Sequence, residues 1–213
     1  MWDTILLGGA IMVPLGLCSV IGLGIIIERS FSMRRIKIIP PEIVRILENI
    51  QSRDDIKLAW NMCNQNAGVF ANIVRVGLES IELSRAEIKE ALEDQGRQEV
   101  RTLEKGMVIL ETVAGIAPLL GLLGTVLGMR EVFGVISLEG LGGTAQLSGG
   151  ISQALITTIF GLSIGILALV FYNFYSKRAE NLISEIEMYS IRLVNKLHHL
   201  QANNEPVLNE GDE

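Results

Sequence analysis

Three long runs of apolar residues alternate with polar stretches along the chain, at residues 4–27, 112–129 and 151–175. They hold 24, 18 and 25 residues, none of them charged. A helix of about 20 apolar residues crosses the ~30 Å hydrocarbon core of a bilayer. The only charged residue before the first run is Asp3. A cleaved signal peptide would have a basic start and a shorter apolar core, so the run is predicted to be a retained span. The pattern therefore predicts an all-α membrane protein with three transmembrane helices that extend into long cytoplasmic helices.

The charges that flank these runs predict an orientation. Arg29, Arg34, Arg35 and Lys37 follow the first run, and residues 177–178, Lys-Arg, follow the third. The connection after Phe133, which links the second run to the third, contains no Lys or Arg. Because Lys and Arg concentrate on the cytoplasmic side of membrane proteins, we expect the N-terminus outside and the C-terminus in the cytoplasm.

The same pattern divides the chain into six parts. They are a first transmembrane helix at 1–33, a cytoplasmic helical insert and stalk at 34–105, a second transmembrane helix at 106–135, an external loop at 136–149, a third transmembrane helix at 150–176, and a cytoplasmic C-terminal helix with a disordered acidic tail at 177–213.

Within the insert, two sequences have the spacing of helix-capping boxes. Ser52 with Asp55, and Ser84 with Glu87, each place a hydroxyl three residues before a carboxylate, as a capping box requires. A further helix is expected over about residues 67–81. The insert is therefore predicted to be helical throughout.

The helix that begins near Arg85 is expected to run into the membrane without a break. We see no Pro or Gly-rich interruption before Gly115. Up to Phe133 this helix would hold about 49 residues and measure ~74 Å. Only ~30 Å of it would fit in lipid, so the remainder would project as a rigid stalk.

The last helix carries a heptad stripe of mostly apolar residues. Such a stripe requires a helix to pack against, and two partners are open: a helix of another chain, or the chain's own insert. The stripe consists of Ile183, Ile186, Ser190, Leu193, Leu197 and Leu200.

Composition excludes several classes of function. The net charge of −6 argues against a nucleic-acid partner. There is no phosphate-binding loop, nucleophile motif or metal-spaced His and Cys cluster, so no catalytic residue, cofactor or metal site is predicted. We expect His198 and His199 to face solvent. Cys18 in an apolar run and Cys63 in a charged loop are expected to be free thiols.

Small residues follow one face of the second and third spans. They allow helix backbones to approach closely where lipid provides no hydrophobic drive for association. The strip on the second span is Ala117, Gly121, Gly124 and Gly128, and the strip on the third is Ala154, Thr158, Gly161, Gly165 and Ala168.

Four polar residues within these spans are the candidates for a function, namely Thr125, Gln153, Thr157 and Thr158. One interpretation is that they hydrogen-bond between helices and hold them together. The other is that they line a narrow path for an ion. None of them titrates, so the chain alone is not expected to relay protons through side chains.

Several of these segments resemble the ExbB/TolQ/MotA proton-channel family, and its ExbB/TolQ branch in particular. They are APLLGLLGTVLGM at 117–129, GGISQALITTIFGL at 149–162 with Tyr172–Asn173 after it, and IIIERSFSMRR at 25–35. The three-span topology and the insert are also similar, so the resemblance covers nearly the whole chain.

The resemblance implies a homopentamer around a central pore in the bacterial inner (cytoplasmic) membrane, in contact with membrane lipid. Two copies of a single-span ExbD/TolR-like protein, each with an intramembrane Asp, would thread the pore. The complex would couple a proton or sodium gradient to mechanical work or transport across the cell envelope, with a TonB-like energy transducer as a further partner. Thr125 and Thr158 match the pore-facing threonines of that family.

Two positions depart from the family's pattern. Gln153 stands where many ExbB and TolQ members carry Glu, and Leu167 where they usually have Pro. Gln resembles Glu in shape but does not titrate. The alternative function is therefore a non-conducting structural scaffold of the same architecture. A transporter that works without any partner is a second rival, which the uncharged spans disfavour.

Overall fold

A computed structural model describes residues 9–139 and 144–202, and all of the regular structure in these residues is helical. The chain forms two compact units. Unit 1 comprises residues 1–31 and 106–176, and unit 2 comprises residues 32–105 and 177–213.

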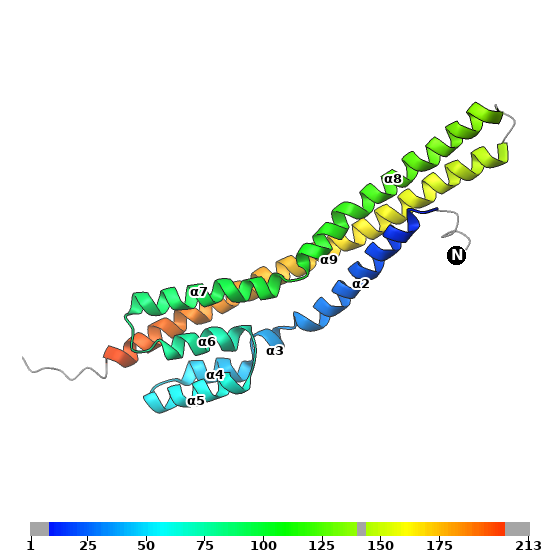
Figure 1. Ribbon diagram of the computed structural model, residues 1–213. Helices are drawn as coiled ribbons and strands as arrows, with labels where there is room; N and C mark the ends of the chain where they lie inside the picture. Colours follow the sequence, from blue (N-terminus) through cyan, green and yellow to red (C-terminus); the bar gives the residue numbers. More distant parts are fainter. Residues whose placement is uncertain (1–8, 140–143, 203–213) are drawn as a thin grey trace, which may run out of the picture. The chain divides into compact units, whose positions relative to one another are not determined.

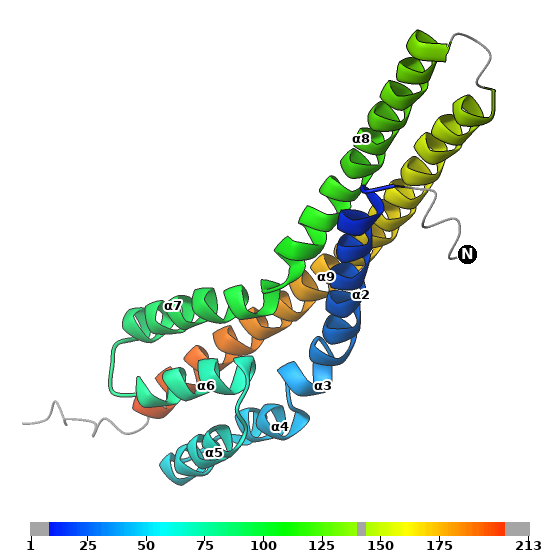
Figure 2. The ribbon, with the colours of Figure 1, turned by 45° about the vertical axis from the view of Figure 1, so that its right-hand side comes forward.

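Unit 1 contains the apolar helices. They are α2 (Met12–Ser32), α8 (Met107–Glu139) and the first part of the 59-residue α9 (Thr144–Ala202). Helices α8 and α9 lie side by side in both ribbon views (Figures 1 and 2). Three segments are long and apolar enough to cross a membrane, at Met12–Ser32, Met107–Leu138 and Gln146–Ala202. The prediction of an all-α membrane protein with three apolar helices is confirmed.

Helix α2 packs beside α9 and α8 within unit 1. The hydroxyl of Tyr175 on α9 donates a hydrogen bond of 2.9 Å to the carbonyl oxygen of Ile26. Tyr175 is buried there. Gly22 lies opposite Val113 of α8, whose Cγ1 would be 3.5 Å from a Cβ atom on the glycine. A small residue at position 22 thus lets the first span approach the second.

The expected uninterrupted helix from Arg85 to Phe133 is wrong. Helix α7 ends at Glu104 and α8 begins at Met107. Between them, Gly106 has a φ of +86°, a left-handed conformation that commonly terminates helices and that glycine adopts without strain. The sequence predicted a continuous helix because one isolated glycine is compatible with a helical pattern.

Part of the external loop expected at 136–149 is helical in the described residues. Helix α8 continues to Glu139, and α9 already begins at Thr144. Gly149 and Gly150 are therefore helical residues. Gly150 is buried against α8, because a Cβ atom there would lie 2.7 Å from Cγ2 of Val132.

Unit 2 consists of short helices packed with the last part of α9. The short helices are α3 (Arg35–Ile38), α4 (Pro41–Asn49), α5 (Arg53–Gln65), α6 (Val69–Glu79) and α7 (Arg85–Glu104). Both predicted capping boxes are confirmed. The Ser52 and Ser84 hydroxyls accept hydrogen bonds from the amides of Asp55 and Glu87, whose carboxylates accept from the serine amides.

The heptad stripe on α9 packs against the chain's own insert. Leu193 is buried, and its Cδ2 would lie 2.7 Å from a Cβ atom on Gly77 of α6. The rings of Phe70 and Tyr189 are 5.4 Å apart between centroids. The sequence left two partners open for this stripe, a helix of another chain and the chain's own insert. In the structure the stripe packs on the insert.

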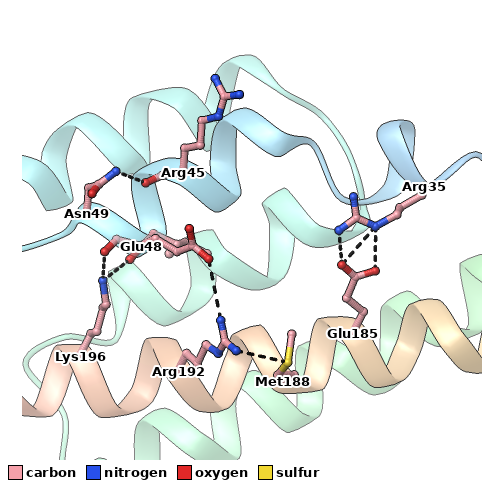
Figure 3. A network of polar contacts seen from close by, with 9 residues as sticks. Arg35, Arg45, Glu48, Asn49, Glu185, Met188, Arg192 and Lys196 are labelled. Atoms are coloured by element: carbon pink, nitrogen blue, oxygen red, sulfur yellow. Dashed lines mark hydrogen bonds and ion pairs between the residues drawn. The ribbon is translucent and has the colours of Figure 1, made fainter.

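Polar contacts fasten the beginning of the insert to α9 (Figure 3). Arg35 forms a bidentate ion pair with Glu185, in which Nε lies 3.0 Å from Oε2. The ammonium of Lys196 donates to the carbonyl oxygens of Leu47, at 2.8 Å, and Glu48. Since these carbonyls belong to the last turn of α4, Lys196 acts as a C-terminal cap supplied by another helix.

The remaining expectations for unit 2 have mixed outcomes. Cys63 is a free thiol, as expected, but it is buried in α5 and not in a charged loop. His198 and His199 are exposed, as expected. The disordered acidic tail was predicted at 202–213. Ala202 is the last residue of α9, and residues 203–213 lie outside the described residues.

Candidate functional site

The candidate site lies where α8 and α9 run closest together. A Cβ atom added to Gly161 would lie 2.6 Å from the carbonyl oxygen of Ala117 and 2.8 Å from Cα of Gly121. Both distances are too short for a carbon atom, and both neighbours are backbone atoms. The two helices therefore meet backbone to backbone, as small residues in membrane helices allow.

This contact extends along both helices in antiparallel order. Towards one end, a Cβ atom on Gly128 would lie 2.8 Å from the carbonyl oxygen of Gly150. Towards the other end, a Cβ atom on Gly165 would lie 2.5 Å from Cγ of Pro118. Pro118 leaves the carbonyl of Ala114 without its usual helical donor, and Gly165 brings the α9 backbone close to that turn.

Thr158 forms the hydrogen bond that joins the two helices at this site. Its Oγ1 donates to the backbone carbonyl oxygen of Gly121 at 3.0 Å. Its side chain is partly buried. The hydroxyl proton is thereby engaged, whereas the oxygen retains lone pairs that can accept a hydrogen bond or coordinate a cation.

Thr157 is the most deeply buried of the four candidate residues, with an exposed fraction of 0%. Its Oγ1 donates within α9, to the carbonyl oxygens of Ala154 at 2.9 Å and Gln153 at 3.2 Å. The side chain fills the space left by Gly124, where a Cβ atom would lie 2.3 Å from this Oγ1. In this arrangement Thr157 contributes to helix packing.

Thr125 lies on α8, one helical turn beyond Gly121. Its Oγ1 donates to the carbonyl oxygen of Leu122 in its own helix at 2.6 Å, and its side chain is half-buried. The separation of four residues between Gly121 and Thr125 corresponds to a rise of about 6 Å along the helix axis. Thr125 and the Thr158 contact with Gly121 thus occupy neighbouring levels of the helix pair.

Gln153 points to a different neighbour. Its amide nitrogen would lie 2.2 Å from a Cβ atom on Gly9, which has a φ of +67° and precedes α2. At 3.6 residues per turn, Gln153 and Thr158 are about 140° apart around α9. The structure therefore brings Thr157 and Thr158 to the α8–α9 contact and places Gln153 against the segment before α2. The Thr125 hydroxyl is bonded within its own helix.

The surroundings of the site are uncharged. Residues 112–129 and 151–175 contain no Asp, Glu, Lys or Arg. In the described part of the chain, no group of three His, Cys, Asp or Glu residues is placed to hold a metal ion. The hydroxyl and carbonyl oxygens are thus the polar atoms that this helix pair can offer to an ion.

Two residues away from the site have structural roles that the sequence pattern did not indicate. Tyr175 had been considered only as the end of an apolar run, and Arg29 only as a topology signal. Arg29 is buried, forms a 2.8 Å ion pair with Glu28, and packs on Gly106, where a Cβ atom would lie 3.4 Å from its Nε. The glycine after Lys105 was the signal that could have located this contact.

Comparison with known proteins agrees with the arrangement of three apolar helices. The model of the MotA/TolQ/ExbB proton channel family matches residues 65–188, more than half of the chain. The chain belongs to this family. The match includes the whole α8–α9 contact, with all four candidate polar residues.

Individual relatives lie in the ExbB-like branch of the family. The chain is 32% identical to the biopolymer transport protein ExbB-like 3 of Synechocystis sp. over 174 residues, which cover 79% of this chain and 81% of that protein. It is 31% identical to ExbB-like 1 of the same organism over 173 residues, 80% of this chain and 68% of that protein. It is 36% identical to the biopolymer transport protein ExbB of Xanthomonas campestris over 109 residues, which cover 51% of this chain and 43% of that protein.

Membership in this family supports a multi-pass membrane protein with a role in transport coupled to an ion gradient. The family is one of proton channels and not of enzymes.

Proposed function

We propose that this chain is the pore-forming subunit of an ion-driven motor in the bacterial inner membrane, with its N-terminus outside and its C-terminus in the cytoplasm. Five copies would surround a single-span ExbD/TolR-like partner whose intramembrane Asp carries the proton or receives the sodium ion. The complex would pass the energy of the gradient to an envelope client such as a TonB-like transducer.

The observation that carries this proposal is the pair of threonines beside the glycine contact. The Thr125 and Thr158 hydroxyls donate to backbone carbonyls, so each oxygen is left with lone pairs that can act as acceptors. An acceptor oxygen can bind the proton of a neutral carboxylic acid or coordinate Na⁺. The partner's carboxyl would supply the titratable group that residues 112–129 and 151–175 lack.

The close contact of α8 and α9 gives this subunit a stiff wall. Backbone-to-backbone packing at Gly121 and Gly161 leaves no flexible side chain between the helices. We propose that the glycines at positions 121, 124, 128, 161 and 165 keep the threonines at a fixed depth while the partner helix moves. Thr157 would serve the same packing and would not touch the ion.

Thr158→Val tests the proposal most directly, because Val keeps the shape of Thr and removes its hydroxyl. The full complex with its co-expressed partner is reconstituted in liposomes, and H⁺ and Na⁺ flux are measured separately. We expect Thr158→Val to lose flux while the complex still assembles, and Thr158→Ser to retain most of it. Ser163→Ala, at an exposed position of the same helix, is the matched control and should leave flux unchanged.

A scaffold without conduction is the second candidate, and the polar geometry gives it support. Both Thr157 and Thr158 hydroxyls already donate to carbonyls within the helix pair, as residues that only hold helices together would do. If Thr158→Val disrupts assembly and flux together, the scaffold role is favoured. Gln153→Glu restores the family's acid, and a flux that stays at zero in this variant at every pH also favours the scaffold.

A transporter that needs no partner makes a separate prediction. The purified chain alone would then move ions across liposomes at the rate of the complete complex. We expect no such flux from the chain without its partner, because no acid lies within residues 112–129 or 151–175.

A further inference from the structure

Helix α9 contacts the first span at two points that lie on one of its faces. Near the carboxyl end of α2, the Tyr175 hydroxyl donates to the carbonyl oxygen of Ile26. Ahead of the amino end of α2, the Gln153 amide packs on Gly9. Gln153 and Tyr175 are 22 residues apart, about six helical turns, so they are only about 40° apart around α9.

The backbone of Gly9 is shaped to accept this contact. Its φ of +67° lies in the left-handed region, which is strained for a residue with a Cβ atom. The Cβ atom itself would overlap the Gln153 amide nitrogen at 2.2 Å. The carbonyl oxygen of Gly9 accepts from the amide of Met12 at 3.1 Å and begins the first turn of α2. Gly9 thus has two roles. Its carbonyl oxygen accepts the first hydrogen bond of the helix, and its lack of a side chain leaves room for the Gln153 amide.

We propose that Gln153 is a positioning residue for the first span, which fixes the amino end of α2 on α9 as Tyr175 fixes its carboxyl end. The side chain at position 153 is then committed to α2, and an ion does not use it. This assignment goes beyond the proposed function and does not depend on whether the complex conducts.

Pairs of spin labels measure the two ends of α2 separately. One pair replaces Val13 and Leu155 near its amino end, and the other replaces Ile27 and Phe174 near its carboxyl end. All four side chains are more than half exposed. The full chain carries Cys18→Ser and Cys63→Ser, and labelled chains are diluted with unlabelled ones in lipid nanodiscs so that electron–electron distances report single subunits.

The assignment predicts a change at one end only. Gln153→Ala should broaden the 13–155 distances and shift them to longer values, while the 27–174 distances stay unchanged. Gly9→Ala should have the same effect on the two distances. The double variant should not lengthen the 13–155 distances beyond those of either single variant, because all three variants lose the same contact between residues 9 and 153. Gly16→Ala is the matched control, since no atom lies within 4 Å of a Cβ atom there, and it should change neither pair.

Two results would overturn the assignment. One is an unchanged 13–155 distance in Gln153→Ala together with altered ion flux, which would place residue 153 on the ion path. The other is an equal change in both label pairs, which would indicate a general loss of packing. Gln153→Glu adds an independent test if the alanine variant does not fold, because it keeps the length of the side chain. It should keep both distances close to those of the parent chain.

Discussion

Gly121 and Gly161 face each other across the α8–α9 contact with no side chain between them, and a Cβ atom on Gly161 would lie 2.8 Å from Cα of Gly121. This pair sets how closely the second and third apolar helices approach. The Thr158 hydrogen bond to the Gly121 carbonyl at 3.0 Å lies at the same level. These glycines therefore determine the spacing of the two helices beside Thr158.

Gly161→Ala should destabilise the chain. The new methyl group would overlap the Ala117 carbonyl oxygen and the Gly121 backbone, and overpacking of this kind costs about 1–3 kcal/mol. Thermal unfolding of the purified chain in detergent should show a lower Tm.

Gly115→Ala is the control for this change. Gly115 is also a helical glycine of α8, but no atom lies within 4 Å of a Cβ atom there. Its Tm should stay the same or rise, because Ala favours the helix by about 1 kcal/mol over Gly. An equal drop in both variants would contradict the packing role of Gly161.

Gly106→Ala tests the break between α7 and α8. Its φ of +86° disfavours any residue with a Cβ atom, at about 1–2 kcal/mol. The added methyl group would also lie 3.4 Å from the Arg29 guanidinium. We expect a lower free energy of unfolding in denaturant titrations. Gly96→Ala within α7 has open space around it and should instead be neutral or stabilising, so similar losses in both would contradict the left-handed break.

Sequence patterns located the elements of this chain well where the signal was local. Apolar runs indicated the three long helices, and the Ser52 and Ser84 capping boxes occur as predicted. The break at Gly106 was missed because a single glycine within a helical pattern is compatible with either a continued helix or its end. Its left-handed backbone lies against Arg29, which is far away in the sequence.

The sequence predicted which residues belong to the candidate site better than it predicted which neighbour each side chain contacts. The spacing of small residues indicated a helix face that includes Thr158, and Thr158 does lie against Gly121. Grouping Gln153 with Thr158 ignored the angle of about 140° between them around α9. The contact of Gln153 with Gly9 joins two spans that no local pattern relates.

Cys63 should be unreactive in the folded chain. Burial raises the pKa of its thiol from 9.0 to about 11, although the Arg75 guanidinium acts in the opposite direction. The thiolate is the reactive form, so a pKa of about 11 in place of 9.0 lowers the thiolate fraction about a hundredfold at neutral pH. In a Cys18→Ser background, maleimide should label Cys63 slowly at pH 7.5 and rapidly after denaturation.

The same shift in the Cys63 pKa predicts a pH dependence of stability. Between pH 9 and 11 the unfolded thiol loses its proton while the folded one retains it, so stability should fall as pH rises through this window. Cys63→Ala should remove this part of the alkaline loss. Fast labelling of the native chain, or an alkaline profile unchanged by the substitution, would contradict the buried neutral thiol.

Lys196→Met should weaken the attachment of α4 to α9. Its ammonium donates to the carbonyl oxygens of Leu47 and Glu48 at the end of α4, and Met keeps the apolar stem while it removes the charge. Hydrogen bonds from charged groups contribute about 1.5–3 kcal/mol when a partner is removed. Lys57→Met is the control, because the Lys57 side chain is 79% exposed and pairs only with the 92% exposed Asp54 at 3.5 Å. Chemical denaturation should show a clear loss for position 196 and almost none for position 57, and hydrogen exchange should increase in α4 first. If the two variants lose equal stability, Lys196 acts through its charge in general and not as the cap of α4.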